Sequence, residues 1–142
     1  MKKLSLLFVL AVAIMILSSC APSNGKLTIN DSWARPAAQS QNSAAYFVIQ
    51  NGTKPDDALL NVKSDIAAVT EVHMSMMNAN EVMTMRMQES VLVPARGEVE
   101  FTPGGLHVML VRLGRDLKTG DTISLTLNFE KAGSMQIQVP VR

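Results

Sequence analysis

The methionines and histidines of this sequence are concentrated in one stretch, and their side chains are of the kinds that bind soft metal ions. Six of the ten methionines fall between Met74 and Met87. Of the only two histidines, His73 precedes this stretch and His107 follows it. Thioether sulfur is a soft, neutral donor and imidazole is a borderline one, so a mixed set of the two suits Cu(I), whereas carboxylates suit harder ions. The pattern therefore predicts a Cu(I) site.

Filling of the hydrophobic core is the alternative explanation for the methionines. Methionine is flexible and packs into irregular gaps, and a single methionine is more often a core residue than a ligand. An ordinary core, however, uses Leu, Ile and Val at alternate positions, as the other apolar segments of this chain do. Two histidines, each with a methionine at a spacing compatible with a strand, favour the metal site.

The geometry of β-strands brings the candidate ligands together. Residues 69–77 and 82–88 are expected to be strands joined by a three-residue loop at 78–80. Directly opposed residues then have Cβ atoms about 4.5–5.5 Å apart. The loop predicts three opposed pairs: Met77 with Glu81, Ser75 with Met83, and His73 with Met85.

A later strand supplies the second half of the predicted site. His107 and Met109 are two residues apart, so they lie on the same face of a strand. The expected metal ligands are His73, Met85, His107 and Met109. Met83 and Met74 remain alternatives to Met85.

The N-terminus carries an export signal. Two lysines are followed by an apolar run at 6–17, which is too short to span a bilayer, and then by Leu17-Ser18-Ser19-Cys20. This segment resembles a bacterial lipobox, in which the cysteine becomes the lipidated first residue. We therefore expect a signal peptide at 1–19, a lipidated Cys20 with a short spacer to residue 25, and one domain at 26–142. The membrane is then reached only through the lipid.

Composition excludes several other classes of protein. Two of the 13 basic residues leave with the signal, so the mature chain has 11 basic and 12 acidic side chains and no basic run that would bind nucleic acid. Cys20 is the only cysteine, which excludes an intramolecular disulfide and a blue-copper thiolate ligand. No phosphate-binding loop or nucleophile elbow is present, so we expect a protein that is not an enzyme.

The remaining chain reads as a series of short strands between turn residues. Stretches rich in Ile, Val and Thr recur with turn residues between them, and no helical periodicity of useful length is found. This pattern predicts an antiparallel β-sandwich or barrel. The expected strands are 26–35, 44–50, 58–62, 69–77, 82–88, 91–94, 99–102, 107–113, 122–129 and 135–141.

These motifs together resemble the periplasmic copper chaperones known as the PCuAC family. The resemblance covers nearly all of the mature chain, and its most specific part is the Pro-Gly-Gly-Leu-His-x-Met-Leu block. The matching segments are the His73, Met85, His107 and Met109 set, Trp33-Ala34-Arg35, Ala44-Ala45-Tyr46-Phe47, Glu71-Val72-His73, Met83-Thr84-Met85-Arg86, and Pro103 to Leu110.

The resemblance implies a cupredoxin-like Greek-key β-sandwich that binds one Cu(I) near its surface. It also implies delivery of copper to an acceptor such as a cytochrome c oxidase subunit, often alongside a thiol-bearing copper chaperone. The protein would be lipid-anchored to a bacterial membrane and would face the periplasm or the outside. Two alternatives remain: copper or silver buffering by the surplus methionines, and a structural β-sandwich lipoprotein without metal.

Overall fold

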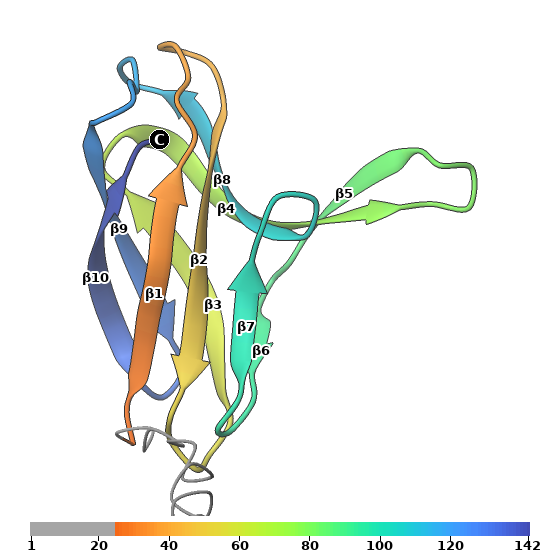
Figure 1. The fold of residues 1–142 in the computed structure, drawn as a ribbon, viewed down its shortest axis with the longest axis vertical. Helices are drawn as coiled ribbons and strands as arrows, with labels where there is room; N and C mark the ends of the chain where they lie inside the picture. The colour runs from red at the N-terminus through yellow and green to blue at the C-terminus, as the bar shows by residue number, and fades with distance from the viewer. Residues whose placement is uncertain (1–24) are drawn as a thin grey trace, which may run out of the picture.

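Ten β-strands make up the fold of residues 25–142, which are the residues that this computed structural model describes (Figure 1). All ten strands expected from the sequence are present, with boundaries within two residues of those expected. They are β1 (Leu27–Ala34), β2 (Ser43–Asn51), β3 (Asp57–Ser64), β4 (Ala67–Met77), β5 (Met83–Met87), β6 (Val91–Val93), β7 (Glu98–Phe101), β8 (Leu106–Leu113), β9 (Thr122–Phe129) and β10 (Gly133–Pro140).

The signal peptide expected at 1–19, the lipidated Cys20 and the spacer as far as residue 24 lie outside the described residues. Residues 25–142 contain no helix that is long and apolar enough to cross a membrane.

The strands form two sheets that pack face to face. The six-stranded sheet has the order β1-β2-β7-β8-β4-β5, and the four-stranded sheet has the order β10-β9-β3-β6. Pairing is antiparallel throughout the described strands except at one residue pair between β7 and β8. The predicted fold class, an antiparallel β-sandwich of the cupredoxin-like kind, is confirmed.

The hydrophobic core lies between the two sheets. Its aromatic centre is a stacked pair, Phe47 and Phe101, with ring centroids 4.5 Å apart. Strand β9 supplies Leu125 and Leu127 from the other sheet, and both are fully buried. Burial of each such leucine contributes about 1.5–3 kcal/mol to folding. Apart from Met135, which packs at the edge of this core, the described methionines are not part of it.

One hairpin projects from the sandwich. Strand β4 pairs with β8 only as far as Met74, and its last residues pair with β5 alone. We call residues 75–87 the hairpin arm; in Figure 1 it extends sideways from the two sheets. All five residues of β5 are exposed, and β5 is the edge strand of the six-stranded sheet.

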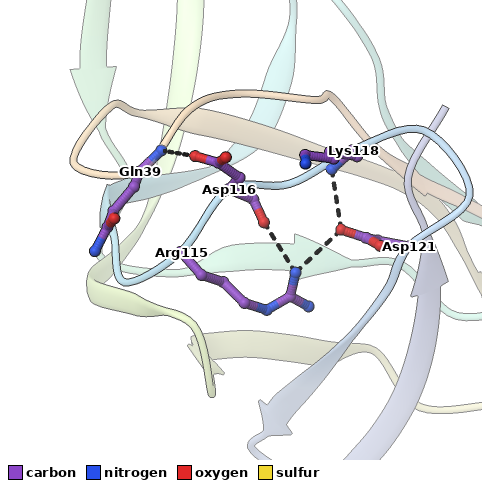
Figure 2. A network of polar contacts seen from close by, with 5 residues as sticks. All are labelled: Gln39, Arg115, Asp116, Lys118 and Asp121. Atoms are coloured by element: carbon purple, nitrogen blue, oxygen red, sulfur yellow. Dashed lines mark hydrogen bonds and ion pairs between the residues drawn. The ribbon is translucent and has the colours of Figure 1, made fainter.

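Two loops at one end of the sandwich are tied to each other by polar contacts (Figure 2). The loop between β1 and β2 donates the backbone N–H of Gln39 to Asp116 Oδ1 at 2.8 Å. In the loop between β8 and β9, Asp121 accepts from the Lys118 backbone N–H and from Arg115, each at 3.0 Å. These two donors lower the pKa of Asp121. The contacts fix the β1–β2 loop, which forms one wall of the site described next.

Candidate metal centre

The predicted ligands lie on the outer face of the six-stranded sheet, which is the face turned away from the four-stranded sheet. On β8, Val108 and Leu110 belong to the core. Because side chains alternate along a strand, His107 and Met109 lie on the opposite face. On β4, Val72 is likewise a core residue, and His73 is on the outer face.

The two histidines are direct neighbours in the sheet. His73 on β4 is paired with His107 on β8. Their ring centroids are 5.8 Å apart, and the planes cross at 78°. His107 is 5% exposed and the side chain of His73 is 14% exposed, so both rings are largely withdrawn from water. The structure therefore brings together the two histidines that the sequence singled out.

Hydrogen bonds fix one nitrogen of each ring and leave the other available. His107 Nδ1 lies 3.0 Å from the carbonyl oxygen of Gly105, which can only accept, so Nδ1 carries the hydrogen. His73 Nε2 lies 2.9 Å from Glu71 Oε2, and the carboxylate accepts its hydrogen. In the neutral rings the lone pairs are then on His107 Nε2 and His73 Nδ1.

His73 Nδ1 is also an unusual atom. It is the one buried side-chain nitrogen or oxygen in the described part of the chain that has no hydrogen-bond partner. Buried polar atoms are normally satisfied, and an exception calls for a ligand or another explanation. In metal-binding histidines, the ring nitrogen that does not bind the metal commonly donates its hydrogen to a carboxylate or a backbone carbonyl, as both rings do here. The histidine pair therefore fits a metal ion.

A cleft of about 420 Å³ adjoins His107 and includes two of the predicted methionines, whereas His73 lies beside His107 in the sheet and does not line the cleft. Met109, Met85 and His107 all line it. Met85 is opposite Ser75, and the Ser75 N–H in turn donates to the carbonyl of Gly105. Because serine is small, the sheet surface beside Met85 stays open where Ser75 lines the cleft.

The predicted register of the hairpin is wrong by two residues. His73 faces Met87 and not Met85, Ser75 faces Met85 and not Met83, and Met77 faces Met83 and not Glu81. The three-residue loop is 79–81, one residue later than expected, because Asn78 Oδ1 accepts the N–H groups of Asn80 and Val82 and fixes the start of the turn. A shift of two keeps every side chain on its predicted face, so Met83, Met85 and Met87 still share one face with His73.

The observed register also distinguishes between Met83 and Met74, the two alternatives to Met85 as a metal ligand. Met83 also lines the cleft, whereas Met74 is paired with Arg86 on the opposite face of the hairpin. Met87 is directly opposite His73, in the place where the sequence predicted Met85. Met85 and Met83 are therefore the methionines of β5 that share the cleft with His107.

Aromatic and cationic side chains form the far wall of the cleft. Tyr46 is buried there, packed on Trp33 with ring centroids 4.5 Å apart, and the Arg35 Cζ lies 5.6 Å from the Tyr46 ring centre. Burial raises the pKa of Tyr46, although the Arg35 charge partly opposes this. The phenol thus stays protonated and does not act as an anionic ligand.

Hard-metal chemistry has little support in the described residues. Between residues 25 and 142 no three His, Cys, Asp or Glu side chains are grouped closely enough to hold a metal ion. The other soft donors beside His107 are the thioethers that line the cleft. Sequence reasoning assigned no role to Glu71 or Ser75, yet the two-residue spacing from Glu71 to His73 already places both on one strand face.

Comparisons with known proteins agree with this geometry. A family model described as "Putative lipoprotein LpqE-like" matches residues 27–141. The "Putative lipoprotein Lxx21020" of Leifsonia xyli subsp. xyli is 25% identical over 114 residues, which cover 80% of this chain and 68% of that protein.

Two solved structures share the fold. The copper-bound PCuAC domain from PmoF2 is 28% identical with a TM-score of 0.69, covering 83% of this chain and 93% of that domain. The solution structure of CuI-DR1885 from Deinococcus radiodurans is 26% identical with a TM-score of 0.61, covering 88% and 87%. The resemblance to PCuAC domains found in the sequence is thus confirmed, and the match over residues 27–141 shows that the chain belongs to the LpqE-like lipoprotein family.

Proposed function

We propose that this protein is a copper carrier that binds one Cu(I) through His73, Met85, His107 and Met109 and hands it to an acceptor protein. The observation that carries the proposal is the pair of adjacent histidines, each with one ring nitrogen held by a hydrogen bond and the other free of protein partners. The protein acts as a binding module and catalyses no reaction.

The donor set favours Cu(I) over harder or more highly charged ions. Two imidazoles and two thioethers are neutral and soft to borderline, and Cu(I) prefers such donors. The site lacks thiolates, which hold Cu(I) much more tightly. The copper-bound state of the PmoF2 domain and the CuI state of DR1885 support the same cargo.

The position of the site suits transfer. Met85 is 58% exposed, and the cleft that it lines opens to solvent. An incoming acceptor can displace the outermost thioether first, while the buried histidines still hold the ion. An acceptor with cysteine ligands then gains copper because thiolate is the stronger Cu(I) ligand. From the family resemblance we propose the copper centre of cytochrome c oxidase as acceptor, with a thiol-bearing chaperone as a further partner.

Anchoring places the carrier at a membrane outside the cytoplasm. Membership of a lipoprotein family supports the lipobox at Leu17-Ser18-Ser19-Cys20, with lipid on Cys20. We propose that the domain faces the periplasm or the outer medium, tethered by the lipid and the spacer to residue 25.

An anaerobic Cu(I) titration with a competing chelator tests the site. Residues 26–142, which contain all ten strands, are expected to bind one ion tightly, and the variant His107→Ala/Met109→Leu is expected to lose tight binding. Met76→Leu, on the other face of the arm, is the matched control and should bind like the unmodified protein. Unchanged affinity in the double variant would reject the proposed ligands.

Buffering of copper or silver is the second candidate function, and the exposed methionines of the arm favour it. A buffer would take up several ions with similar affinities, whereas a carrier has one tight site. The stoichiometry from the same titration decides between them.

A further inference from the structure

Four methionines, Met77, Met83, Met85 and Met87, share the outer face of the hairpin arm, and the proposed carrier site uses only Met85. Met77, Met83 and Met85 are 65%, 50% and 58% exposed. None packs in the core, so core packing does not explain why these exposed positions of the arm hold methionines and not polar residues.

The hairpin register places the side chains of Met77 and Met83 closer together than those of a hydrogen-bonded pair of opposed residues. They are directly opposed. The Asn78 N–H donates to the carbonyl of Val82, so 78 and 82 are a hydrogen-bonded pair, and pairs alternate along the ladder. Met77 and Met83 are therefore a non-hydrogen-bonded pair, the type in which side chains of antiparallel strands approach most closely.

The methionines of this face continue from the pair into the cleft. Met83 and Met85 are two residues apart on β5, so they share a face, and both line the cleft together with His107 and Met109. Thioethers are thus present from the exposed part of the arm to the cleft that His107 lines.

We propose that Met77 and Met83, with Met85, form a second and weaker site for a soft monovalent cation, Cu(I) or Ag(I), through which the ion enters and leaves the carrier site. This inference rests on the proposed function, because Met85 is shared by both sites. The ion exchanges one ligand at a time: thioethers of Met77 and Met83 are replaced by imidazole and by Met109 while Met85 stays bound. Copper remains Cu(I) throughout, and no electron is transferred.

The donor chemistry predicts a weak and quickly exchanging site. The second site consists of three neutral thioethers on an exposed arm and includes neither imidazole. The arm also does not pair with the four-stranded sheet. The site accordingly binds Cu(I) or Ag(I) but not Zn²⁺, which prefers nitrogen and thiolate ligands.

The test uses the full chain in detergent micelles with ¹³C-labelled methionine methyl groups, titrated anaerobically with Cu(I). The first equivalent should shift the methyl resonances of Met85 and Met109. The second equivalent should shift those of Met77 and Met83, which alone hold the second ion while Met85 is bound to the first. Met77→Leu/Met83→Leu should lose the second binding event, keep the first-site affinity, and take up Cu(I) from a chelator complex several-fold more slowly.

The matched control removes two methionines from the opposite face of the same hairpin. Met74→Leu/Met76→Leu should retain the second binding event and the normal uptake rate. If Met77 and Met83 do not shift, or if the two double variants behave alike, the entry site is refuted and the carrier site still stands.

A third variant keeps failure of the entry site distinct from failure of the carrier site. His107→Ala/Met109→Leu should lose tight binding and keep the weak shifts of Met77 and Met83, and loss of those shifts would refute an entry site that binds by itself. If the unmodified protein shows the weak shifts but no tight first site, the carrier function is refuted and the methionine site still stands.

Discussion

The contact between Glu71 and His73 provides a quantitative test of how the site is organised. Glu71 Oε2 accepts the hydrogen of His73 Nε2 at 2.9 Å and thereby leaves Nδ1 as the nitrogen with a lone pair. In Glu71→Ala the ring loses this partner and is free to rotate or to carry its hydrogen on Nδ1, where it blocks the metal. Loss of such a partner typically lowers metal affinity about 10- to 100-fold, which is about 1.4–2.7 kcal/mol.

Stability of the metal-free protein should change much less. The side chain of Glu71 is 35% exposed, and partly exposed ion pairs contribute about 0–1 kcal/mol. Glu71→Ala should therefore weaken Cu(I) binding strongly and leave the melting temperature of the metal-free protein nearly unchanged. A chelator competition titration measures the first, and thermal unfolding of the metal-free protein measures the second.

Two further variants separate orientation from charge. Glu71→Gln keeps an oxygen that accepts the Nε2 hydrogen and removes the negative charge, so its affinity should stay near that of the unmodified protein. Glu130→Ala removes the same charge from an exposed turn residue directly after β9 and should have no effect. If Glu71→Ala binds Cu(I) normally, or if Glu71→Gln is as weak as Glu71→Ala, hydrogen-bonded positioning of His73 is refuted.

Three other substitutions probe the cleft and the fold. Met85→Leu conserves volume at an exposed position, so the melting temperature should be unchanged while competition titration finds weaker Cu(I) binding; normal binding would remove Met85 from the ligands. Ser75→Val adds bulk beneath the cleft and should weaken Cu(I) binding in the same titration without unfolding the arm. Asp57→Asn should lower the free energy of unfolding by about 1–3 kcal/mol in denaturant titrations, since the buried carboxylate accepts backbone N–H groups of Ala58, Lys131 and Ala132. Burial alone would raise the pKa of Asp57, but these hydrogen bonds and the Lys131 charge lower it overall. A lowered pKa stabilises the fold above the ordinary value of about 3.9, and the contribution is lost as the pH falls through the folded-state pKa, so the stability difference between the unmodified protein and the Asp57→Asn variant should narrow below about pH 4.

The strands could be predicted from the sequence because each has its own local pattern. Alternation of apolar residues and the turn residues between them located all ten strands, and the two-residue spacing of His107 and Met109 correctly placed both on one face. The pairing of His73 with His107 could not be predicted, because it depends on the order β8-β4-β5 in the sheet, and long-range strand order leaves no local signal.

The hairpin register shows where local preference misleads. The last residue of a three-residue loop takes the left-handed conformation, which asparagine adopts more readily than glutamate, so the sequence favours Asn80 there. The structure instead has Glu81 at φ +60°, because the Asn78 side chain accepts two backbone N–H groups and sets the turn one residue later. Moving the loop by one residue shifts each partner by two. The candidate ligands therefore keep their predicted faces, although their partners across the hairpin differ from those predicted.

The position of the site also separates metal binding from folding. A structural zinc site contributes directly to folding, so its metal cannot leave without loss of the fold. Here the buried core lies between the sheets. The histidines and Met109 lie on the outer face of the six-stranded sheet, and Met83 and Met85 lie on β5, which pairs only with β4. Release of an ion bound at this face would therefore leave the core contacts intact. A carrier needs this independence, because it must stay folded in both the loaded and the empty state.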